Sequence, residues 1–327
     1  MDKSFYRPVS GAVLPRYAGI ATFMRLPFLD PENAGEVDIG LIGVPWDGGT
    51  TNRAGARHGP RQMRDMSTMV RSVHHVSGLM PFEIMNCADL GDCPVNPIDI
   101  MDTLKRVEHF FRRVHDAGIL PLSAGGDHLV SLPIMRGIHT GIPMGMVHFD
   151  AHTDTWDRYF GDCAFTHGTP FRRAIEEGLL DPKRTVQIGV RGALYSPADK
   201  EWGLAQGIRV IEIEEFFDLG VDAVIAEAHR VVGDGPTYVS FDVDCLDPVY
   251  APGTGTPEIG GINTFDAQRL IRGLSGLNLI GGDVVEVSPP FDMSGGTAHA
   301  AVTIMFEILC VLAESHAARG GRLGTVS

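Results

Sequence analysis

Seven short apolar runs recur along the chain, and amphipathic stretches of helical period lie between several of them. The runs have the length of β-strands, are rich in Val and Ile, and end at Gly, Pro, Asn or Asp. They span residues 37–44, 119–126, 145–152, 185–191, 208–213, 237–244 and 278–287. The helical period is clearest at 101–118, 221–232, 264–274 and 300–315. Because alternating strands and helices require right-handed crossovers, the pattern predicts a three-layer α/β/α fold with a mostly parallel sheet.

The chain has no linker-like tract and no internal repeat. We therefore expect an irregular N-terminal arm over residues 1–36 and a single domain over residues 37–327. No apolar run reaches membrane-spanning length, and the first residues lack the apolar core of a signal peptide. Five scattered cysteines form no disulfide-like framework, so we expect a location in the reducing cytoplasm.

The charge of the chain restricts its partners. It has 27 Lys and Arg residues against 41 Asp and Glu residues, a formal net charge of −14. Such a charge repels phosphate backbones and anionic lipids, so we expect neither nucleic acid nor a membrane as a partner. A small cationic substrate would be attracted instead.

Acidic residues and histidines cluster where three of the predicted strands end. In extended backbone, side chains two residues apart point to the same side, and ligands bind at the carboxyl ends of parallel strands. The clusters lie in GGDH, HFDAHTD and SFDVDC and offer His128, Asp150, His152, Asp154, Asp242 and Asp244. Four carboxylates balance two divalent cations, whereas without metal they would repel one another. The set predicts a binuclear metal site, and its many oxygen atoms favour manganese, with nickel as the alternative.

Neighbouring residues receive structural interpretations. We expect His148 to be a structural residue on the inner part of its strand, Cys245 to be a core residue, and Asp247 to close a turn or support a metal ligand. The glycine-rich loop at 46–60 lacks the Gly-Lys-Ser/Thr ending of a phosphate loop, so we expect it to be structural. His299 is expected at the surface or at a helix cap.

Five motifs together resemble the ureohydrolase family of arginases, agmatinases and guanidino-acid hydrolases. They are GGDH (125–128), HFDAHTD (148–154), FTHGTPF (165–171), SFDVDCLDP (240–248) and EVSPPFD (286–292). Framework segments outside these motifs most resemble guanidinopropionase- and guanidinobutyrase-like members. The resemblance covers nearly the whole chain and implies an arginase-like fold, a trimer or hexamer, and hydrolysis of a guanidine C–N bond to urea and an amine.

The resemblance also assigns the metal ligands. It implies that one ion is bound by His128, Asp150, Asp154 and Asp242, and the other by Asp150, His152, Asp242 and Asp244. A hydroxide bridging the two ions would attack the guanidinium carbon.

Three further roles follow from the resemblance. Asp154 would carry the proton to the leaving amine. His167 matches a proton-shuttling histidine, and an imidazole titrates in a suitable pH range. Glu286 matches the acid that holds the substrate guanidinium.

The sequence departs from the family pattern at Trp156. Members that bind a carboxylate have an asparagine at this position, and an indole replaces its hydrogen bonds with a large apolar face. Tyr159 resembles the tyrosine of guanidinopropionase-like members and would narrow the pocket. Because of Trp156 we expect an N-alkylated guanidine or a biguanide such as metformin as the substrate. The framework supports the alternative, 3-guanidinopropionate or 4-guanidinobutyrate.

Two other functions are compatible with parts of the sequence. The chain could be an inactive scaffold subunit of a mixed oligomer, although the loss of metal ligands that would mark such a subunit is not seen. An arginase-like deacetylase with a single zinc ion is a further alternative. The set of four Asp and two His, together with Glu286, argues against it.

Overall fold

One sheet of eight strands runs through the molecule in the order β2-β1-β3-β8-β7-β4-β5-β6. This computed structural model describes residues 3–196 and 198–319. All neighbouring strands pair in parallel, as the sequence pattern predicts. The strands are β1 Ile39–Gly43, β2 Cys87–Asp92, β3 Leu120–Ala124, β4 Met144–Phe149, β5 Leu180–Val190, β6 Arg209–Glu212, β7 Thr237–Asp242 and β8 Leu279–Val285. Each of the seven predicted runs overlaps a strand, and β2, with the sequence CADLGD, was not predicted.

The helices include all four that show clear amphipathic period. They are α1 Gly59–Met66, α2 Pro81–Ile84, α3 Ile100–Asp116, α4 Ser131–Ile138, α5 Pro170–Glu176, α6 Ala198–Gln206, α7 Ile213–Leu219, α8 Val221–Val232, α9 Thr264–Arg272 and α10 Gly296–Ala318. Asp99 starts α3 by accepting hydrogen bonds from the backbone N–H groups of Met101 and Asp102. The other helices are mostly short, so they show too few turns for their period to be recognised in the sequence.

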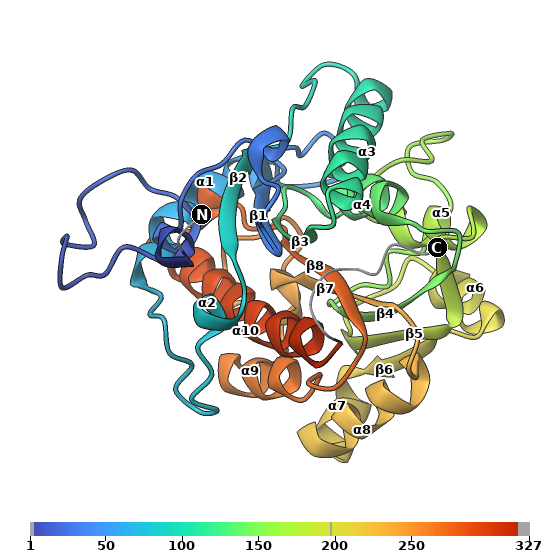
Figure 1. The fold of residues 1–327 in the computed structure, drawn as a ribbon. Helices are drawn as coiled ribbons and strands as arrows, with labels where there is room; N and C mark the ends of the chain where they lie inside the picture. Colours follow the sequence, from blue (N-terminus) through green and yellow to red (C-terminus); the bar gives the residue numbers. More distant parts are fainter. Residues whose placement is uncertain (1–2, 197, 320–327) are drawn as a thin grey trace.

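Helices cover both faces of the sheet (Figure 1). A separate hydrophobic core lies between the sheet and the helices on each face. On one face, Val147 and Phe149 of β4 belong to a core shared with α8, α9 and α10. On the other face, Met144 and Met146 belong to a core shared with α3, α4 and α5. Side chains thus alternate between the faces along β4, as a strand buried on both sides requires. The predicted three-layer α/β/α fold is confirmed.

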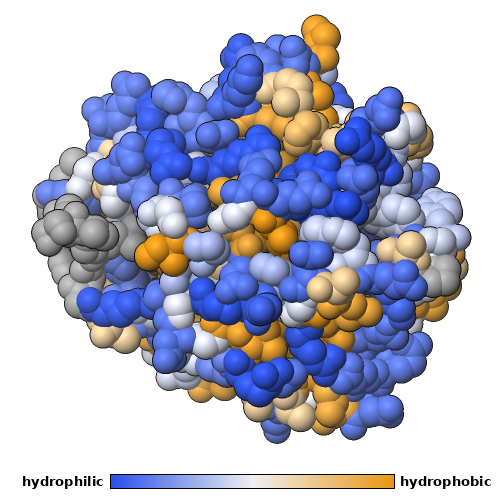
Figure 2. Space-filling model, turned by 90° about the vertical axis from the view of Figure 1, so that its right-hand side faces the viewer, coloured by the Kyte–Doolittle hydropathy of each residue, from blue (hydrophilic) through white to orange (hydrophobic). Residues whose placement is uncertain are grey.

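Helix α10 is long and apolar enough to cross a membrane, but 72% of its most apolar window is buried inside the protein. It packs on β8 and α9 and belongs to the core of the α8–α10 face. Its apolar character is therefore explained by packing. Figure 2 shows one face of the molecule, where hydrophilic side chains predominate and hydrophobic ones form separate patches.

The residues before β1 contain three short 3-10 helices, Lys3–Tyr6, Phe23–Arg25 and Pro31–Asn33. One isolated bridge, between Phe28 and Asp89, links this segment to β2. The division into an arm and a single domain at residue 36 stays a prediction.

Candidate metal centre and active site

The acidic and histidine clusters lie at the carboxyl ends of β3, β8, β7 and β4, which are neighbours in the sheet. His128 begins the 3-10 helix His128–Val130 after β3, and Asp150 directly follows β4. Asp242 is the last residue of β7, and Asp244 lies in the 3-10 helix Val243–Cys245. Glu286 directly follows β8. The strand order therefore brings together residues that are far apart in the sequence, at the edge of the sheet where ligands bind in such folds.

The loop before His128 requires glycine for a steric reason. A Cβ atom at Gly126 would lie 1.6 Å from the carbonyl oxygen of Trp46, so no side chain fits there. The same backbone is fixed by the N–H of Glu286, which donates to the carbonyl of Gly126 over 2.8 Å. This close approach anchors the loop that carries His128 against its neighbours.

The three residues of HFDAHTD lie together for a different reason from the one that we predicted. Strand β4 ends at Phe149, so Asp150, His152 and Asp154 are not part of extended backbone. Asp154 instead adopts a left-handed conformation with φ 50°, and Glu286 does the same with φ 65°. This conformation is energetically unfavourable for non-glycine residues, and those that adopt it are concentrated at functional sites. A turn, rather than alternation along a strand, brings the third side chain back to the other two.

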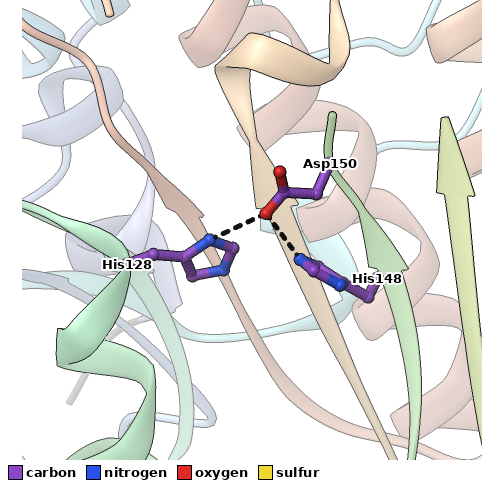
Figure 3. A group of neighbouring side chains, drawn as sticks. All are labelled: His128, His148 and Asp150. Atoms are coloured by element: carbon purple, nitrogen blue, oxygen red, sulfur yellow. Dashed lines mark hydrogen bonds and ion pairs between the residues drawn. The ribbon is translucent and has the colours of Figure 1, made fainter. Parts of the chain in front are cut away.

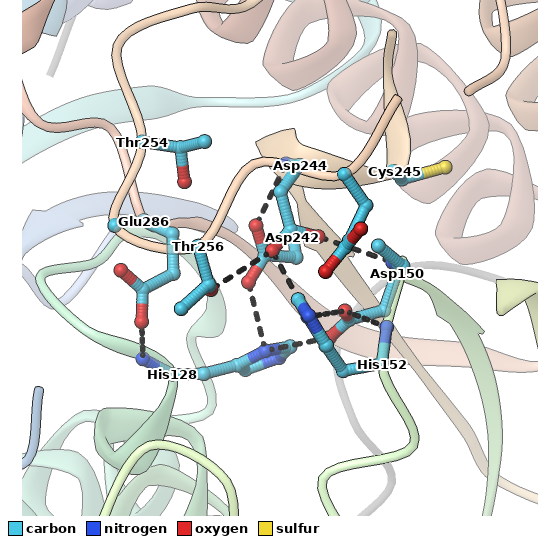
Figure 4. A network of polar contacts seen from close by, with 12 residues as sticks. His128, Asp150, His152, Asp242, Asp244, Cys245, Thr254, Thr256 and Glu286 are labelled. Carbon is cyan, nitrogen blue, oxygen red and sulfur yellow. Dashed lines mark hydrogen bonds and ion pairs between the residues drawn. The ribbon is translucent and has the colours of Figure 1, made fainter. Parts of the chain in front are cut away.

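Three carboxylates converge on one ring nitrogen of His128, and Figure 4 labels two of them, Asp150 and Asp242. Its Nδ1 lies 3.0 Å from Asp150 Oδ2, 3.0 Å from Asp154 Oδ2 and 3.2 Å from Asp242 Oδ2. All four side chains are buried. The group formed by these atoms is the set that the family resemblance assigns to one metal ion.

A second group shares Asp150 with the first. His152 Nδ1 lies 3.3 Å from Asp150 Oδ1 and 3.1 Å from Asp244 Oδ2. The two oxygens of Asp150 therefore face different imidazoles, Oδ2 toward His128 and Oδ1 toward His152. The N–H groups of Ala151 and Asp244 steady this region by donating to Asp244 Oδ1 and Asp242 Oδ1 respectively.

Burial and neighbouring charges shift the pKa values of these acids away from their ordinary values. Burial, followed by the charges of Asp244 and Asp150, raises the pKa of Asp242 well above its ordinary value. Burial and Asp150 also raise the pKa of Asp244. At Asp150, burial opposes ionisation, but His148 and His128 hold the pKa well below its ordinary value. The cluster thus holds buried carboxylates with raised pKa values next to one with a lowered pKa. A bound cation would stabilise the ionised form of all of them.

The hydrogen bonds of His128 test whether a cation fits. Its Nε2 lies 2.8 Å from Ser240 Oγ, and the hydroxyl proton of Ser240 is donated to Asp283 Oδ1 over 2.7 Å. Nε2 must therefore carry the hydrogen, which leaves Nδ1 of the neutral ring with a lone pair. That Nδ1 is buried and makes no hydrogen bond. A lone pair facing three carboxylate oxygens is unfavourable unless a cation lies between them. Without metal that cation is a proton, because burial opposes protonation of His128 but the three carboxylates raise its pKa well above the ordinary value. A metal ion can take the place of this proton, so the residues fit a metal ion.

His148 contacts this cluster through Asp150 (Figure 3). Its Nε2 lies 2.8 Å from Asp150 Oδ2, and its ring packs on Phe171 of α5 with 4.5 Å between ring centroids. The residue is fully buried and does not line the cavity described below.

His167 and Glu286 form a buried pair beside the carboxylate cluster. His167 Nδ1 lies 2.8 Å from Glu286 Oε1, which also accepts from the backbone N–H of His128 over 3.0 Å. On its other side, His167 Nε2 lies 2.7 Å from Thr51 Oγ1. Burial opposes protonation of His167, but Glu286 raises its pKa to about 9. The second carboxylate oxygen of Glu286, Oε2, is buried and has no hydrogen-bond partner.

A cavity of about 480 Å³ opens onto this cluster. Asp154, Asp242, His152 and His167 line its inner end. Three aromatic rings line its outer part, where Trp156 lies 5.4 Å from Tyr159 and 5.6 Å from Tyr195 between ring centroids. The outer rings come from the loops after β4 and β5. The cavity therefore combines an acidic inner end with an aromatic outer wall, which suits a cation that carries a short tail.

Sequence reasoning missed several residues of this cavity, among them Tyr195, Thr51 and Arg53. Tyr195 lies in a loop with no motif, and nothing in its neighbourhood marks it as functional. Thr51 belongs to the loop at 46–60, for which we predicted only a structural role, yet it lines the cavity and contacts His167. The TTNR sequence of that loop offers polar side chains, but their direction depends on the fold.

The remaining structural interpretations agree with the geometry. Asp247 accepts hydrogen bonds from the N–H groups of Val249, Gly260 and Gly261, so it closes a turn. Cys245 is buried in the core of the α8–α10 face, and His299 is exposed.

Comparisons with known proteins agree with the motifs. A sequence model described as the arginase family matches residues 37–311. The guanidinopropionase of Pseudomonas aeruginosa is 64% identical over 318 residues, which cover 97% of this chain and 99% of that protein. The guanidinobutyrase of the same organism is 46% identical over 314 residues, which cover 95% and 98% of the two chains. Among solved structures, the proclavaminate amidino hydrolase from Streptomyces clavuligerus has a TM-score of 0.88 and 39% identity, with 92% of this chain and 100% of that chain covered.

Proposed function

The chain belongs to the arginase family, and on that premise we propose that it is a metal-dependent guanidino-acid hydrolase that forms urea and an amino acid. Its fold is the arginase-like α/β fold, and its relatives include enzymes named for acting on guanidinopropionate and guanidinobutyrate. We therefore propose 3-guanidinopropionate or 4-guanidinobutyrate as the substrate. The biguanide that Trp156 favoured has less support, because the chain is similar to guanidino-acid enzymes over nearly its whole length.

The observation that carries this proposal is the convergence of three carboxylates on the lone pair of His128 Nδ1. We propose that His128, Asp150, Asp154 and Asp242 hold one divalent ion and that Asp150, His152, Asp242 and Asp244 hold the other. The oxygen-rich set favours manganese, with nickel as the alternative. When bound, two divalent ions supply the acidification of a water molecule that makes it a nucleophile at neutral pH.

Glu286 is the proposed anchor of the substrate guanidinium. Its Oε2 is buried without a partner, while Oε1 is held by His167 and by the backbone of His128. A planar cation would satisfy the free oxygen with a charge-assisted hydrogen bond. The anchoring would fix the guanidinium carbon beside the carboxylate cluster, because the same two neighbours orient Glu286.

Two residues are proposed to move protons. Asp154 lies at the inner end of the cavity and is held in its left-handed conformation beside His128. It is placed to accept a proton from the attacking water and to pass it to the leaving nitrogen. Glu286 raises the pKa of His167 to about 9, which favours protonation of this imidazole in the metal-free protein. With Thr51 on its outer side, it is placed to exchange protons between the cavity and the inner site.

A substrate carboxylate needs a partner other than the amide that Trp156 replaces. Two arginines line the cavity. The Arg191 guanidinium is fully engaged, since it donates to backbone carbonyls that include those of Asp244 and Glu258. Arg53 donates to the carbonyls of Thr254 and Gly255, over 2.8 Å and 3.4 Å, and forms no ion pair with a described residue. We propose that Arg53 pairs with the substrate carboxylate.

A second candidate substrate is an N-alkylated guanidine or a biguanide, favoured by one observation. Trp156, Tyr159 and Tyr195 form an aromatic wall, and such walls bind cationic and flat groups well. Binding against this wall does not require a carboxylate on the substrate.

Urea release by the purified protein tests both candidates. The protein would be loaded separately with Mn²⁺ and Ni²⁺ and given 3-guanidinopropionate, 4-guanidinobutyrate, agmatine, arginine and dimethylbiguanide. Hydrolysis of the acids supports the proposed function, and an Arg53→Met variant should then lose activity on the acids but not on agmatine. Hydrolysis of dimethylbiguanide alone would replace the proposal with the second candidate.

If none of the five compounds yields urea, both candidate substrates are contradicted. That result would favour the scaffold-subunit interpretation, in which a related chain is required. We further propose that the chain works in the cytoplasm as a homo-oligomer, a trimer or hexamer. Size-exclusion chromatography with light scattering measures that oligomeric state directly.

A further inference from the structure

We infer that His148 and Gln187 are positioning residues that orient the carboxylate of Asp150 so that its two oxygens serve two different metal ions. This inference rests on the metal centre in the proposed function. Sequence reasoning gave His148 a structural role only, and Gln187 stands outside every motif.

The geometry around Asp150 is asymmetric. His148 and His128 approach the same oxygen, Oδ2, at 2.8 Å and 3.0 Å (Figure 3). The other oxygen, Oδ1, faces His152 and accepts from its backbone N–H over 2.6 Å. Each oxygen of Asp150 is thus directed by a separate group, which fixes the rotation of the carboxylate.

Gln187 determines which nitrogen of His148 carries the hydrogen. The amide nitrogen of Gln187 lies 2.6 Å from the carbonyl oxygen of Thr153 and 3.0 Å from His148 Nδ1. A backbone carbonyl only accepts, so the Gln187 atom facing it must be the NH₂ group. The second proton of that group is then available to His148 Nδ1, which must accept. His148 Nε2 consequently carries the hydrogen and donates it to Asp150.

The same assignment separates His148 from the metal ligands. His128 presents a lone pair to the carboxylates, because Ser240 and Asp283 occupy its other nitrogen. His148 presents an N–H group to Asp150, because Gln187 occupies its other nitrogen. Two imidazoles at the same oxygen of one carboxylate therefore have different roles, one as a ligand and one as a hydrogen-bond donor.

The sheet holds this device rigidly. His148 on β4 and Gln187 on β5 are directly paired residues of neighbouring strands, and both are fully buried. Phe171 closes over the His148 ring. The donor is thus fixed before a metal ion arrives, and groups that orient ligands in this way typically contribute ~10–100-fold to metal affinity.

The test compares Mn²⁺ binding by the whole chain and its variants, with calorimetry for the dissociation constants and atomic emission for the stoichiometry. His148→Ala removes the donor, and His148→Gln places an amide N–H near the position of Nε2. The matched control is His74→Ala. His74 is also a buried histidine bound to an acid, with Nε2 2.9 Å from Glu307 Oε2, but it lies outside the cavity.

We expect His148→Ala to weaken Mn²⁺ binding by ~10–100-fold and His148→Gln to restore most of the loss. His74→Ala should lower Tm but change the dissociation constants by less than about twofold, as expected for a distant site. Wild-type affinity in His148→Ala, or an equal loss in His148→Gln, would overturn the inference. Loss of affinity in His74→Ala as large as that in His148→Ala would also overturn it, since general destabilisation would then be the cause.

A second variant keeps the test decisive if His148→Ala does not fold. Gln187→Met preserves volume and removes the N–H donors, so it should weaken Mn²⁺ binding while His148 remains in place; unchanged binding would refute the inference. The wild-type titration separates this failure from that of the proposed function. If the wild-type chain binds two Mn²⁺ and the variants bind them equally well, the inference fails and the proposed function stands. If the wild type binds no Mn²⁺, the inference and the proposed function both fail.

Discussion

The inner and outer ends of the cavity are built in different ways. At the inner end, most of the acids and imidazoles lie within a few residues of a strand end and are held by several short contacts, as Asp150 is by His148 and by its neighbours. At the outer end, Trp156 and Tyr195 lie on connecting loops, and their rings pack edge to face. Tyr195 is 88% exposed, whereas Asp150 is fully buried.

This difference indicates how the protein divides its tasks. A rigid, desolvated inner end suits the reaction itself, because metal ligands and proton carriers must keep fixed positions. An outer wall on loops can change without disturbing the sheet, so it suits the choice among guanidines with different tails. Substitutions at the two ends should therefore have effects that differ in size and in kind.

Removing the shared carboxylate should have the largest effect. Asp150→Ala is expected to lose bound metal and to lower urea release by roughly 10⁴-fold or more, because groups that act as a unit fail together. Metal content and activity are measured on the same preparation. The matched control is Asp247→Ala, which removes a turn-closing aspartate and should keep its metal. Retained turnover in Asp150→Ala would refute the two-metal assignment.

Neutralising Glu286 should lower activity without releasing metal. Glu286→Gln keeps the shape of the side chain but loses the charge that faces the substrate guanidinium. The free energy of the transition state should therefore rise by roughly 2–5 kcal/mol, which lowers kcat/KM by about 30- to 5,000-fold. Glu258, an acid among the outer residues of the cavity, provides the comparison. Glu258→Gln should have a much smaller effect, and equal losses in the two variants would erase the distinction between the two ends.

The buried pair at the inner end should make stability depend on pH in metal-free protein. The pKa of His167 is raised from 6.5 to about 9. Its ion pair with Glu286 is thus fully present below pH 6.5, where it contributes on the order of 3 kcal/mol, and is lost as the pH rises through about 9.

Chemical denaturation of wild-type and His167→Gln protein in chelator measures this contribution. The difference between their free energies of unfolding should be largest near pH 6 and should disappear near pH 10. Trp156→Phe, at the outer end, should show a difference that does not vary with pH. A pH-independent difference for His167→Gln would show that the pair is not ionised.

Exchanging the indole at the outer end should have the smallest effect, and it should change preference more than rate. Trp156→Asn supplies an amide for the substrate carboxylate, so kcat/KM for guanidino acids should rise relative to that for dimethylbiguanide. One added hydrogen bond contributes about 1 kcal/mol, or about fivefold. An unchanged preference would show that Trp156 does not contact the substrate tail.

The sequence predicted the sheet and the inner end of the cavity better than the outer end. Runs such as 237–244 combine strand length with paired acids, so both the element and its candidate residues were recognised. Strand β2 was missed because CADLGD has two acids and little apolar character. The direction of Tyr195 depends on the course of a loop, and the contact of His148 with Gln187 depends on which strands are neighbours. Neither property is encoded in local spacing.

The position of β8 in the sheet has a consequence for the synthesis of this protein. β8 is the last strand of the sheet along the described chain, yet it lies between β3 and β7. Until it has left the ribosome, the sheet consists of two separate parts, β2-β1-β3 with His128 and β7-β4-β5-β6 with the other proposed ligands. Both parts expose strand edges during this period, and such long-range pairing is slow to form. The complete ligand set is therefore assembled only after β8 joins the two parts.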